Sequence, residues 1–307
     1  MPRHRIRRSA LSVSVTATVL LAVSAAGGAY LTGRWPDHAP AAVASVSSVS
    51  PAATAPAAAR TSEEPVVDLD TELAGAVEPL LTGADAATLS VAVLDSGSGA
   101  RAVYGGADTT YDTASIVKVD ILAALLLRAQ DEKRELTAGE RGHAVAMIEK
   151  SDNDSATALL AAVGGAAGLD AANERFGLTA TTAAHAWGLT RTTAADQLTL
   201  LAAVFGTDTD TGLSADSRTY LRGLMAGVEA DQQWGVSAAG SGWALKNGWM
   251  PRTATGLWNI NSIGQVKFDG HTYLVAVLSG GQQTKESGIA LVESAAKAAV
   301  GVLKAAG

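Results

Sequence analysis

Cysteine is absent from the 307-residue sequence, which excludes disulfides, thiolate catalysis, cysteine-ligated zinc and a lipid-modified cysteine anchor. The five histidines form no H-x-x-x-H or H-E-x-x-H pattern, so a metal hydrolase is not expected. No pattern calls for a metal or an organic cofactor. Charged residues make up only 17% and the net charge is −7, which argues against nucleic acid as a partner because phosphate binding needs clustered Lys and Arg.

Four arginines within the first eight residues precede an apolar run from about Ala10 to Leu31. Positive residues before an apolar stretch are typical of an export signal. The run is also long enough to cross a bilayer, which needs about 20 residues. We therefore interpret residues 1–35 as a signal peptide or an uncleaved signal-anchor. We expect a protein that is secreted or anchored to the outer face of the cytoplasmic membrane, with no other membrane contact.

Residues 36–65 are rich in Ala, Pro and Ser and are expected to form a disordered linker, because such a stretch buries too little surface to offset its ordering entropy. The folded part is expected to span residues 66–307, as a monomer. Two strands, a helical block, three strands and terminal helices predict an α+β fold with one five-stranded antiparallel sheet, flanking terminal helices and an all-helical lobe. Periodicity predicts helices over 66–81 and 289–305, strands over 88–94, 101–104, 241–246, 256–267 and 271–278, and a helical block over 115–201.

The first candidate for chemistry is the pair Ser115 and Lys118. A spacing of three residues on a helix places both side chains on one face, where a neutral lysine could take the serine proton and make a nucleophile. The spacing alone is not specific, because Ser294 and Lys297 share it. The alternative is a helix-capping serine with an exposed lysine. However, the helix around Lys118 is apolar nearly all round, which predicts burial, and lysine is rarely buried without a reason.

Two further segments carry polar groups suited to catalysis. Ser-Asp-Asn at 151–153 offers a hydroxyl that could relay a proton and a carboxamide that could hold a substrate amide. The alternative is a polar helix start. Lys-Asn-Gly at 246–248, at the end of the expected strand, offers a lysine for an anionic group and a small residue beside which substrate could lie as an added strand. The alternative is a hairpin turn, for which Asn-Gly is a strong signal.

In this order, Ser-x-x-Lys, Ser-Asp-Asn and Lys-x-Gly resemble the motifs of the active-site serine penicillin-recognising enzymes, and among them most closely the class A β-lactamases. The stretch over 158–169 is similar to the helix and turn that follow Ser-Asp-Asn in class A. The resemblance covers residues 66–307 and implies a β-lactamase/transpeptidase-like fold.

The resemblance also implies roles for the matching residues. Ser115 would be acylated, Lys118 would accept its proton or assist the group that does, and Ser151 would relay a proton to the leaving nitrogen. The backbone amide of Ser115 would form half of an oxyanion hole, a contribution of roughly 3 to 4 kcal/mol per donor.

The remaining matching residues would bind substrate. Asn153 would hold the side-chain amide, and Lys246 would attract the substrate carboxylate and stabilise Ser151. Gly248 would let substrate lie against the strand, and the backbone amide of Trp249 would complete the oxyanion hole.

Two departures from class A stand out. Asn247 replaces the usual threonine or serine of the third motif, at a position expected to point away from substrate. The class A loop that carries Glu-x-x-Leu-Asn is replaced by a shorter segment over 178–193 without any carboxylate. Glu174, just before it, fits a solvated helix face, and His185 fits a packed loop better than a general base. Loss of a general base typically costs on the order of 10² to 10⁴ in rate, so slow release of the acyl group is expected.

These observations predict an exported class A β-lactamase-like serine hydrolase that forms an acyl-enzyme with small β-lactams or acyl-D-alanyl peptides and deacylates slowly. Two alternatives remain open. One is a cell-wall D,D-peptidase or transpeptidase that uses the same residues. The other is a non-catalytic protein that binds or senses β-lactams or peptidoglycan.

Overall fold

The computed structural model describes residues 67–83, 87–206 and 212–307. The predicted signal segment and linker, residues 1–65, lie outside this part of the chain. Among the residues described, no single helix is long and apolar enough to cross a membrane, although a bent pair over 153–163 and 165–176 meets the criterion of length and composition.

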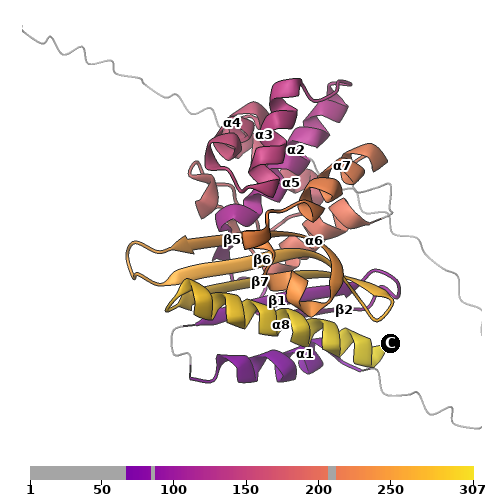
Figure 1. The fold of residues 1–307 in the computed structure, drawn as a ribbon, viewed down its shortest axis with the longest axis vertical. Coiled ribbons are helices and arrows are strands. Elements are labelled where there is room, and N and C mark those ends of the chain that lie inside the picture. Colours follow the sequence, from indigo (N-terminus) through magenta and orange to yellow (C-terminus); the bar gives the residue numbers. More distant parts are fainter. Residues whose placement is uncertain (1–66, 84–86, 207–211) are drawn as a thin grey trace, which may run out of the picture. The chain divides into compact units, whose positions relative to one another are not determined.

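Five strands form one antiparallel sheet in the order β2-β1-β7-β6-β5 (Figure 1). The two ends of the described chain meet in this sheet, because β1 pairs along its whole length with β7. The expected α+β class and the five-stranded antiparallel sheet are therefore confirmed. The strands are β1 (Thr88–Asp95), β2 (Arg101–Tyr104), β5 (Ser241–Pro251), β6 (Trp258–Phe268) and β7 (His271–Gln282).

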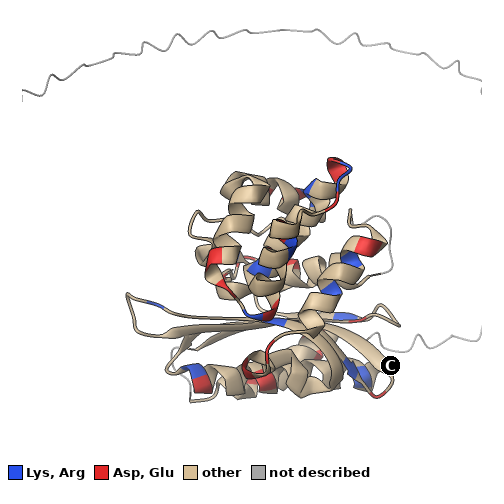
Figure 2. Ribbon diagram, turned by 45° about the horizontal axis from the view of Figure 1, so that its top comes forward, with Lys and Arg blue, Asp and Glu red and all other residues tan. Residues whose placement is uncertain are grey.

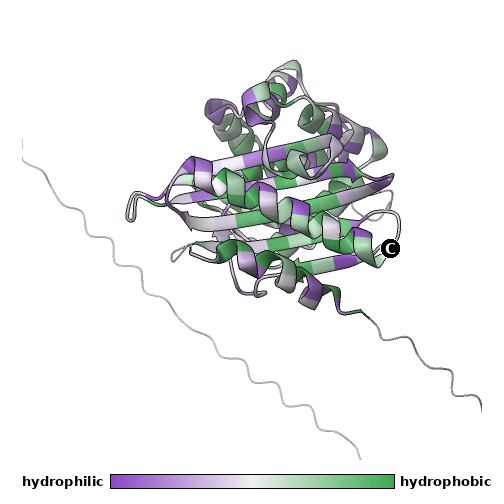
Figure 3. Cartoon of the chain, turned by 60° about the horizontal axis from the view of Figure 1, so that its bottom comes forward, coloured by the Kyte–Doolittle hydropathy of each residue, from purple (hydrophilic) through white to green (hydrophobic). Residues whose placement is uncertain are grey.

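Alternation along the strands sends side chains into two separate cores. In β1, Val91 and Val93 pack on one side with the terminal helices, whereas Ala92 packs on the other side with the helical lobe. The terminal helices α1 (Leu69–Val77) and α8 (Lys285–Ala306) lie side by side across the first face (Figure 3). Fully buried aliphatic side chains contribute about 1.5–3 kcal/mol each, so both faces of the sheet stabilise the fold.

The helical lobe covers the second face of the sheet and is organised around α2 (Val117–Asp131). This helix is apolar nearly all round, and 12 of its 15 residues are buried, as expected for a helix surrounded by others. Most of the ribbon carries no charged residue (Figure 2). The other helices of the lobe are α3 (Ala138–Glu149), α4 (Asn153–Val163), α5 (Gly165–Phe176), α6 (Ala194–Phe205) and α7 (Ala215–Ala226).

The structure differs from the sequence predictions in two places near the motifs. Strand β5 does not end at Lys246 but continues to Pro251, so the hairpin-turn alternative for Asn247-Gly248 is wrong. The lobe is not wholly helical, because β3 (Tyr111–Asp112) pairs with β4 (Arg191–Thr192). A strand of two residues is too short to show the alternation of polar and apolar side chains from which strands are predicted.

Candidate active site

Ser115 lies on the 3₁₀ turn η2 (Ala114–Ile116), which continues directly into α2. The preceding residue, Ala114, has φ +47°, in the left-handed region that costs a non-glycine residue roughly 1–2 kcal/mol. Ser115 is half-buried and lines a cavity of about 330 Å³. Strained backbone beside an accessible hydroxyl is characteristic of functional sites.

Lys118, one helical turn after Ser115, has no exposed surface. Its Nζ donates three hydrogen bonds, to Ser151 O at 2.6 Å, Ser151 Oγ at 3.1 Å and Asn153 Oδ1 at 2.9 Å. Burial lowers the pKa of Lys118 to about 8, and the charge of nearby Asp152 partly opposes that shift. In the ammonium form all three protons are used, whereas the neutral amine gains a lone pair that could accept the proton of Ser115.

Ser151 lies in the short connection between α3 and α4, with φ +57°. Asp152, the next residue, caps α4 by accepting the Ser155 N–H at 2.7 Å. The Ser151 Oγ accepts from two lysines, Lys118 at 3.1 Å and Lys246 at 3.0 Å. Because both lysines donate to this oxygen, the hydroxyl hydrogen of Ser151 stays available to another acceptor.

Lys246, on β5, is also fully buried. Besides Ser151, its Nζ donates to Asn247 O at 3.0 Å and to Gln232 Oε1 at 3.5 Å. Burial holds the pKa of Lys246 well below its usual range, and the neighbouring charge of Lys118 adds to the shift. Lys246 therefore reaches Ser151 from strand β5. Gln232 is a further partner of Lys246 that no sequence pattern indicated.

Gly248 sets the contact between the sheet and the turn that carries Ser115. A Cβ at this position would lie 2.7 Å from Thr113 O and 2.8 Å from Ser115 N, so only glycine lets β5 approach this closely. Asn247, whose side chain points the other way, donates to Gln232 O at 2.7 Å and Trp234 O at 3.0 Å. The expectation that Asn247 turns away from the site agrees with this geometry.

The cavity beside Ser115 combines two further predicted residues with a group that sequence reasoning missed. Asn153 and Trp249 line it. The Oδ1 of Asn153 is occupied by Lys118, which leaves its Nδ2 as a donor for a ligand. Trp187, on the turn η3 (Trp187–Leu189), lines the same cavity and lies 4.8 Å from Lys118 Nζ by its ring centroid. A single tryptophan among small loop residues gave no signal of this contact.

All seven predicted site residues thus come together in the structure, from η2, α2, the connection before α4, α4 itself and β5. They are Ser115, Lys118, Ser151, Asn153, Lys246, Gly248 and Trp249.

Carboxylates do not line the serine cavity in the described part of the chain. Glu174 is exposed on α5, and His185 is exposed in the loop before η3. Asp120 on α2 is buried, which raises its pKa to about 8, but it lies against the Asn173 carboxamide rather than in the cavity. Within the described ranges, no group of three or more His, Cys, Asp or Glu residues could hold a metal ion.

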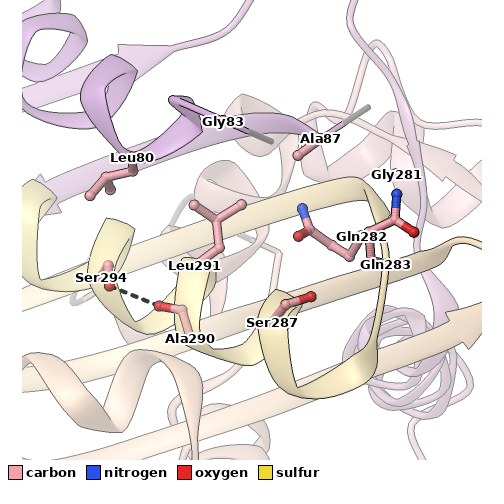
Figure 4. A pocket seen from close by; sticks show the side chains of 10 residues that line it. All are labelled: Leu80, Gly83, Ala87, Gly281, Gln282, Gln283, Ser287, Ala290, Leu291 and Ser294. Atoms are coloured by element: carbon pink, nitrogen blue, oxygen red, sulfur yellow. Dashed lines mark hydrogen bonds between the residues drawn. The ribbon is translucent and has the colours of Figure 1, made fainter. Parts of the chain in front are cut away.

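A larger cavity, of about 500 Å³, lies elsewhere, between the turn η1 (Glu78–Leu81) and α8 (Figure 4). Ser294 of the second Ser-x-x-Lys sequence lines it, and its Oγ donates to Ala290 O at 2.8 Å within the helix. Lys297 is exposed. Size alone therefore does not identify the active site, because none of the described residues that line this cavity is a Lys, His, Asp or Glu that could activate Ser294.

The chain resembles one protein family in sequence and several solved structures in fold. The model of the beta-lactamase enzyme family matches residues 141–303. No curated protein sequence matches the chain. Among solved structures, a class A beta-lactamase from Bacteroides cellulosilyticus is 18% identical, with a TM-score of 0.67, and the match covers 78% of this chain and 100% of that one.

Two other similar structures are the TLA-1 extended spectrum beta-lactamase and a mutant of PBP-A. TLA-1 is 17% identical with a TM-score of 0.68, and the match covers 76% of this chain and 99% of that one. PBP-A, solved as an acyl-enzyme complex with penicillin G, is 22% identical with a TM-score of 0.65, over 76% of this chain and 97% of that one. At these identities the likeness establishes the fold.

Proposed function

The chain belongs to the beta-lactamase enzyme family, and we propose that it is a serine hydrolase in which Ser115 forms an acyl-enzyme with β-lactams or acyl-D-alanyl peptides. The observation that carries this proposal is the environment of Lys118. It is fully buried, bonded to Ser151 and Asn153, and its pKa is lowered to about 8. At pH 7 about a tenth of the molecules would hold it as the neutral amine, which is the form that can act as a base.

The proposed acylation step assigns each of these groups a role. Neutral Lys118 takes the proton of Ser115 while the Ser115 Oγ bonds to the substrate carbonyl carbon. The oxyanion that forms is stabilised by the backbone amides of Ser115 and Trp249. The carbon–nitrogen bond then breaks, and the leaving nitrogen receives the hydroxyl proton of Ser151. One of the two lysines that bond Ser151 Oγ returns a proton to it.

Deacylation is proposed to be slow. Release of the acyl group needs a base to activate water, and no described Asp or Glu side chain lines the serine cavity. Loss of a general base typically costs on the order of 10² to 10⁴ in rate. Lys118 is a candidate base for this step, and it lies under the Trp187 ring.

A second candidate function rests on the same missing carboxylate. If the acyl-enzyme persists, the protein acts as a binder or sensor of β-lactams or peptidoglycan, or as a cell-wall D,D-peptidase or transpeptidase that passes the acyl group to an amine. The PBP-A structure of similar fold was captured as an acyl-enzyme with penicillin G. Export or anchoring by residues 1–35, and the monomeric state, remain predictions from the sequence.

The test is to incubate the full-length chain with benzylpenicillin and follow its intact mass over time. A single adduct that persists for many minutes is expected, and Ser115→Ala should give none. Ser294→Ala is the matched control and should form the adduct as the parent does. Rapid loss of the adduct with product accumulation would contradict slow deacylation, and an adduct on Ser115→Ala would contradict the assignment of the nucleophile.

A further inference from the structure

A further cavity, of about 340 Å³, lies next to the serine cavity and is distinct from the 500 Å³ cavity beside α8. This second cavity contains charged groups that the proposed reaction does not use. Its walls include Thr110, Asp112, Arg191 and Arg252. Arg252 begins the loop that joins β5 to β6, a hairpin that extends beyond the rest of the sheet (Figure 1).

The two cavities are lined by different residues of the same three chain segments. Three chain segments line the serine cavity and then reach the second cavity only two residues further on, a distance of at most about 7 Å along the backbone. One segment leads back from η2, one leads on from η3 into β4, and one leads out of β5. The residue pairs are Ala114 and Asp112, Leu189 and Arg191, and Met250 and Arg252.

The charges in the second cavity do not cancel. The side chain of Asp112 is only 5% exposed and pairs with two guanidinium groups, those of Arg191 and Arg252. Two cations against one carboxylate leave a net positive charge, in a wall that is partly shielded from solvent. An anion that enters this cavity would therefore be attracted rather than repelled.

The two arginines differ in how many donors they have left. All three guanidinium nitrogens of Arg191 already donate hydrogen bonds within the protein. Its Nη1 donates to Asp112 at 3.1 Å, and its Nε and Nη2 donate to Thr110. Within the described residues, the Arg252 side chain makes one ion pair, with Asp112 through Nη1, and it is 40% exposed. Its Nε and Nη2 are therefore free to donate to a ligand, in the fork geometry that suits a carboxylate.

The order of residues along β5 relates the Arg252 guanidinium to the position of a bound substrate. Gly248 lies beside Ser115, Lys246 precedes it on β5, and Arg252 directly follows the end of the strand at Pro251. Lys246 and Ser151 occupy the side that, in the proposed function, protonates the leaving nitrogen. The acyl part of the substrate would then extend the other way, past Met250 toward Arg252. Four residues from Gly248 to Arg252 span at most about 14 Å of extended backbone, and the guanidinium pairs with Asp112, three residues before Ser115. A side chain of several bonds would therefore connect the reacting carbonyl to this group.

We propose that Arg252, held by Asp112 beside Arg191, is a specificity-determining residue that binds a carboxylate at the far end of the acyl side chain. The inference rests on the proposed acylation of Ser115. The preferred substrates are acyl donors whose side chain ends in an anionic group, separated from the reacting carbonyl by a flexible chain of several bonds.

The test uses two cephalosporins with the same nucleus, one with an adipyl side chain that ends in a carboxylate and one with its uncharged monoamide. The second-order rate of Ser115 acylation is measured for each with the full-length chain by intact mass. The carboxylate probe should react roughly threefold to tenfold faster, as expected for a partly exposed charge-assisted pair. Added salt should reduce the ratio, because screening weakens an exposed ion pair.

Variants identify the residue responsible for the preference. Arg252→Gln should bring the ratio of the two rates to about one, and Arg252→Lys should keep part of the preference. Arg101→Gln, which changes an exposed arginine on β2, is the control and should keep the full ratio. If the parent acylates with both probes at equal rates, or if Arg252→Gln slows both equally, the subsite is refuted while the proposed function stands. If neither probe labels Ser115, the proposed function itself fails.

Discussion

The sequence contains two Ser-x-x-Lys segments, and they differ in the burial of the lysine and in the groups around the serine. Lys118 has no exposed surface and bonds to two other site residues, whereas Lys297 is exposed to solvent on α8. Ser115 lies on η2, directly before α2, and shares its cavity with Asn153. Ser294 sits within α8, donates back to Ala290 O and lines a different cavity. The comparison shows that spacing places the two groups on one face, while burial lowers the pKa of the lysine and gives it catalytic potential.

The largest contrast is expected from removing each lysine. Lys118→Ala should lower the rate of acylation by a β-lactam on the order of 10² to 10⁴, because the proposed general base is lost. Lys297→Ala should leave the rate unchanged, because that lysine faces solvent. The rates are measured by intact mass under pseudo-first-order conditions. Equal rates for Lys118→Ala and the parent would remove Lys118 from the mechanism.

The pH dependence tests the protonation state of Lys118 without a mutation. Its pKa is about 8, and the neutral form is the base, so the fraction able to act rises with pH. Between pH 6 and pH 9 the acylation rate should rise by roughly two orders of magnitude and level off above about pH 8. Ser115→Ala provides the blank for hydrolysis of the β-lactam by hydroxide. A rate that falls over this range would mean that Lys118 acts as the cation.

A smaller difference, in stability, is expected when a glycine near each Ser-x-x-Lys segment is changed to alanine. Gly248→Ala would place a Cβ 2.7 Å from Thr113 O and 2.8 Å from Ser115 N, so η2 must shift. Thermal unfolding should show a loss of about 1–3 kcal/mol, with slower acylation. Gly301→Ala on α8 has no heavy atom within 4 Å of the new Cβ and should stabilise by about 0.5–1 kcal/mol. A neutral Gly248→Ala would contradict the close approach of β5 to the nucleophile.

Much of the fold could be predicted because its signals are local. The alternation over 88–94 and 101–104 gave β1 and β2 nearly to the residue, and the apolar helix around Lys118 predicted its burial. The continuation of β5 through Asn247-Gly248 was missed because the dipeptide has the composition of a turn. Here the glycine serves a tertiary contact, the approach of the strand to Ser115, which local patterns do not encode.

The same distinction applies to the site. The seven motif residues could be proposed from the sequence because the motifs carry characteristic chemical types and spacings, and the family resemblance added Trp249. Trp187 over Lys118, Gln232 beside Lys246 and the pairing of Asp112 with two arginines were missed. Each of these contacts joins residues that are 14 or more positions apart, through loops whose paths the sequence does not fix. The segment over 178–193, in contrast, could be seen from the sequence to contain no carboxylate, and none of the described residues that line the serine cavity is Asp or Glu.

The most direct test of the central claim is to locate the acyl group. The full-length chain is incubated with benzylpenicillin, digested and mapped by tandem mass spectrometry, so that the peptides containing Ser115 and Ser294 are read from one sample. The proposed acylation of Ser115 predicts the adduct on Ser115 and an unmodified Ser294. An adduct on Ser294 or another residue, or no adduct on Ser115 at saturating penicillin, would contradict it.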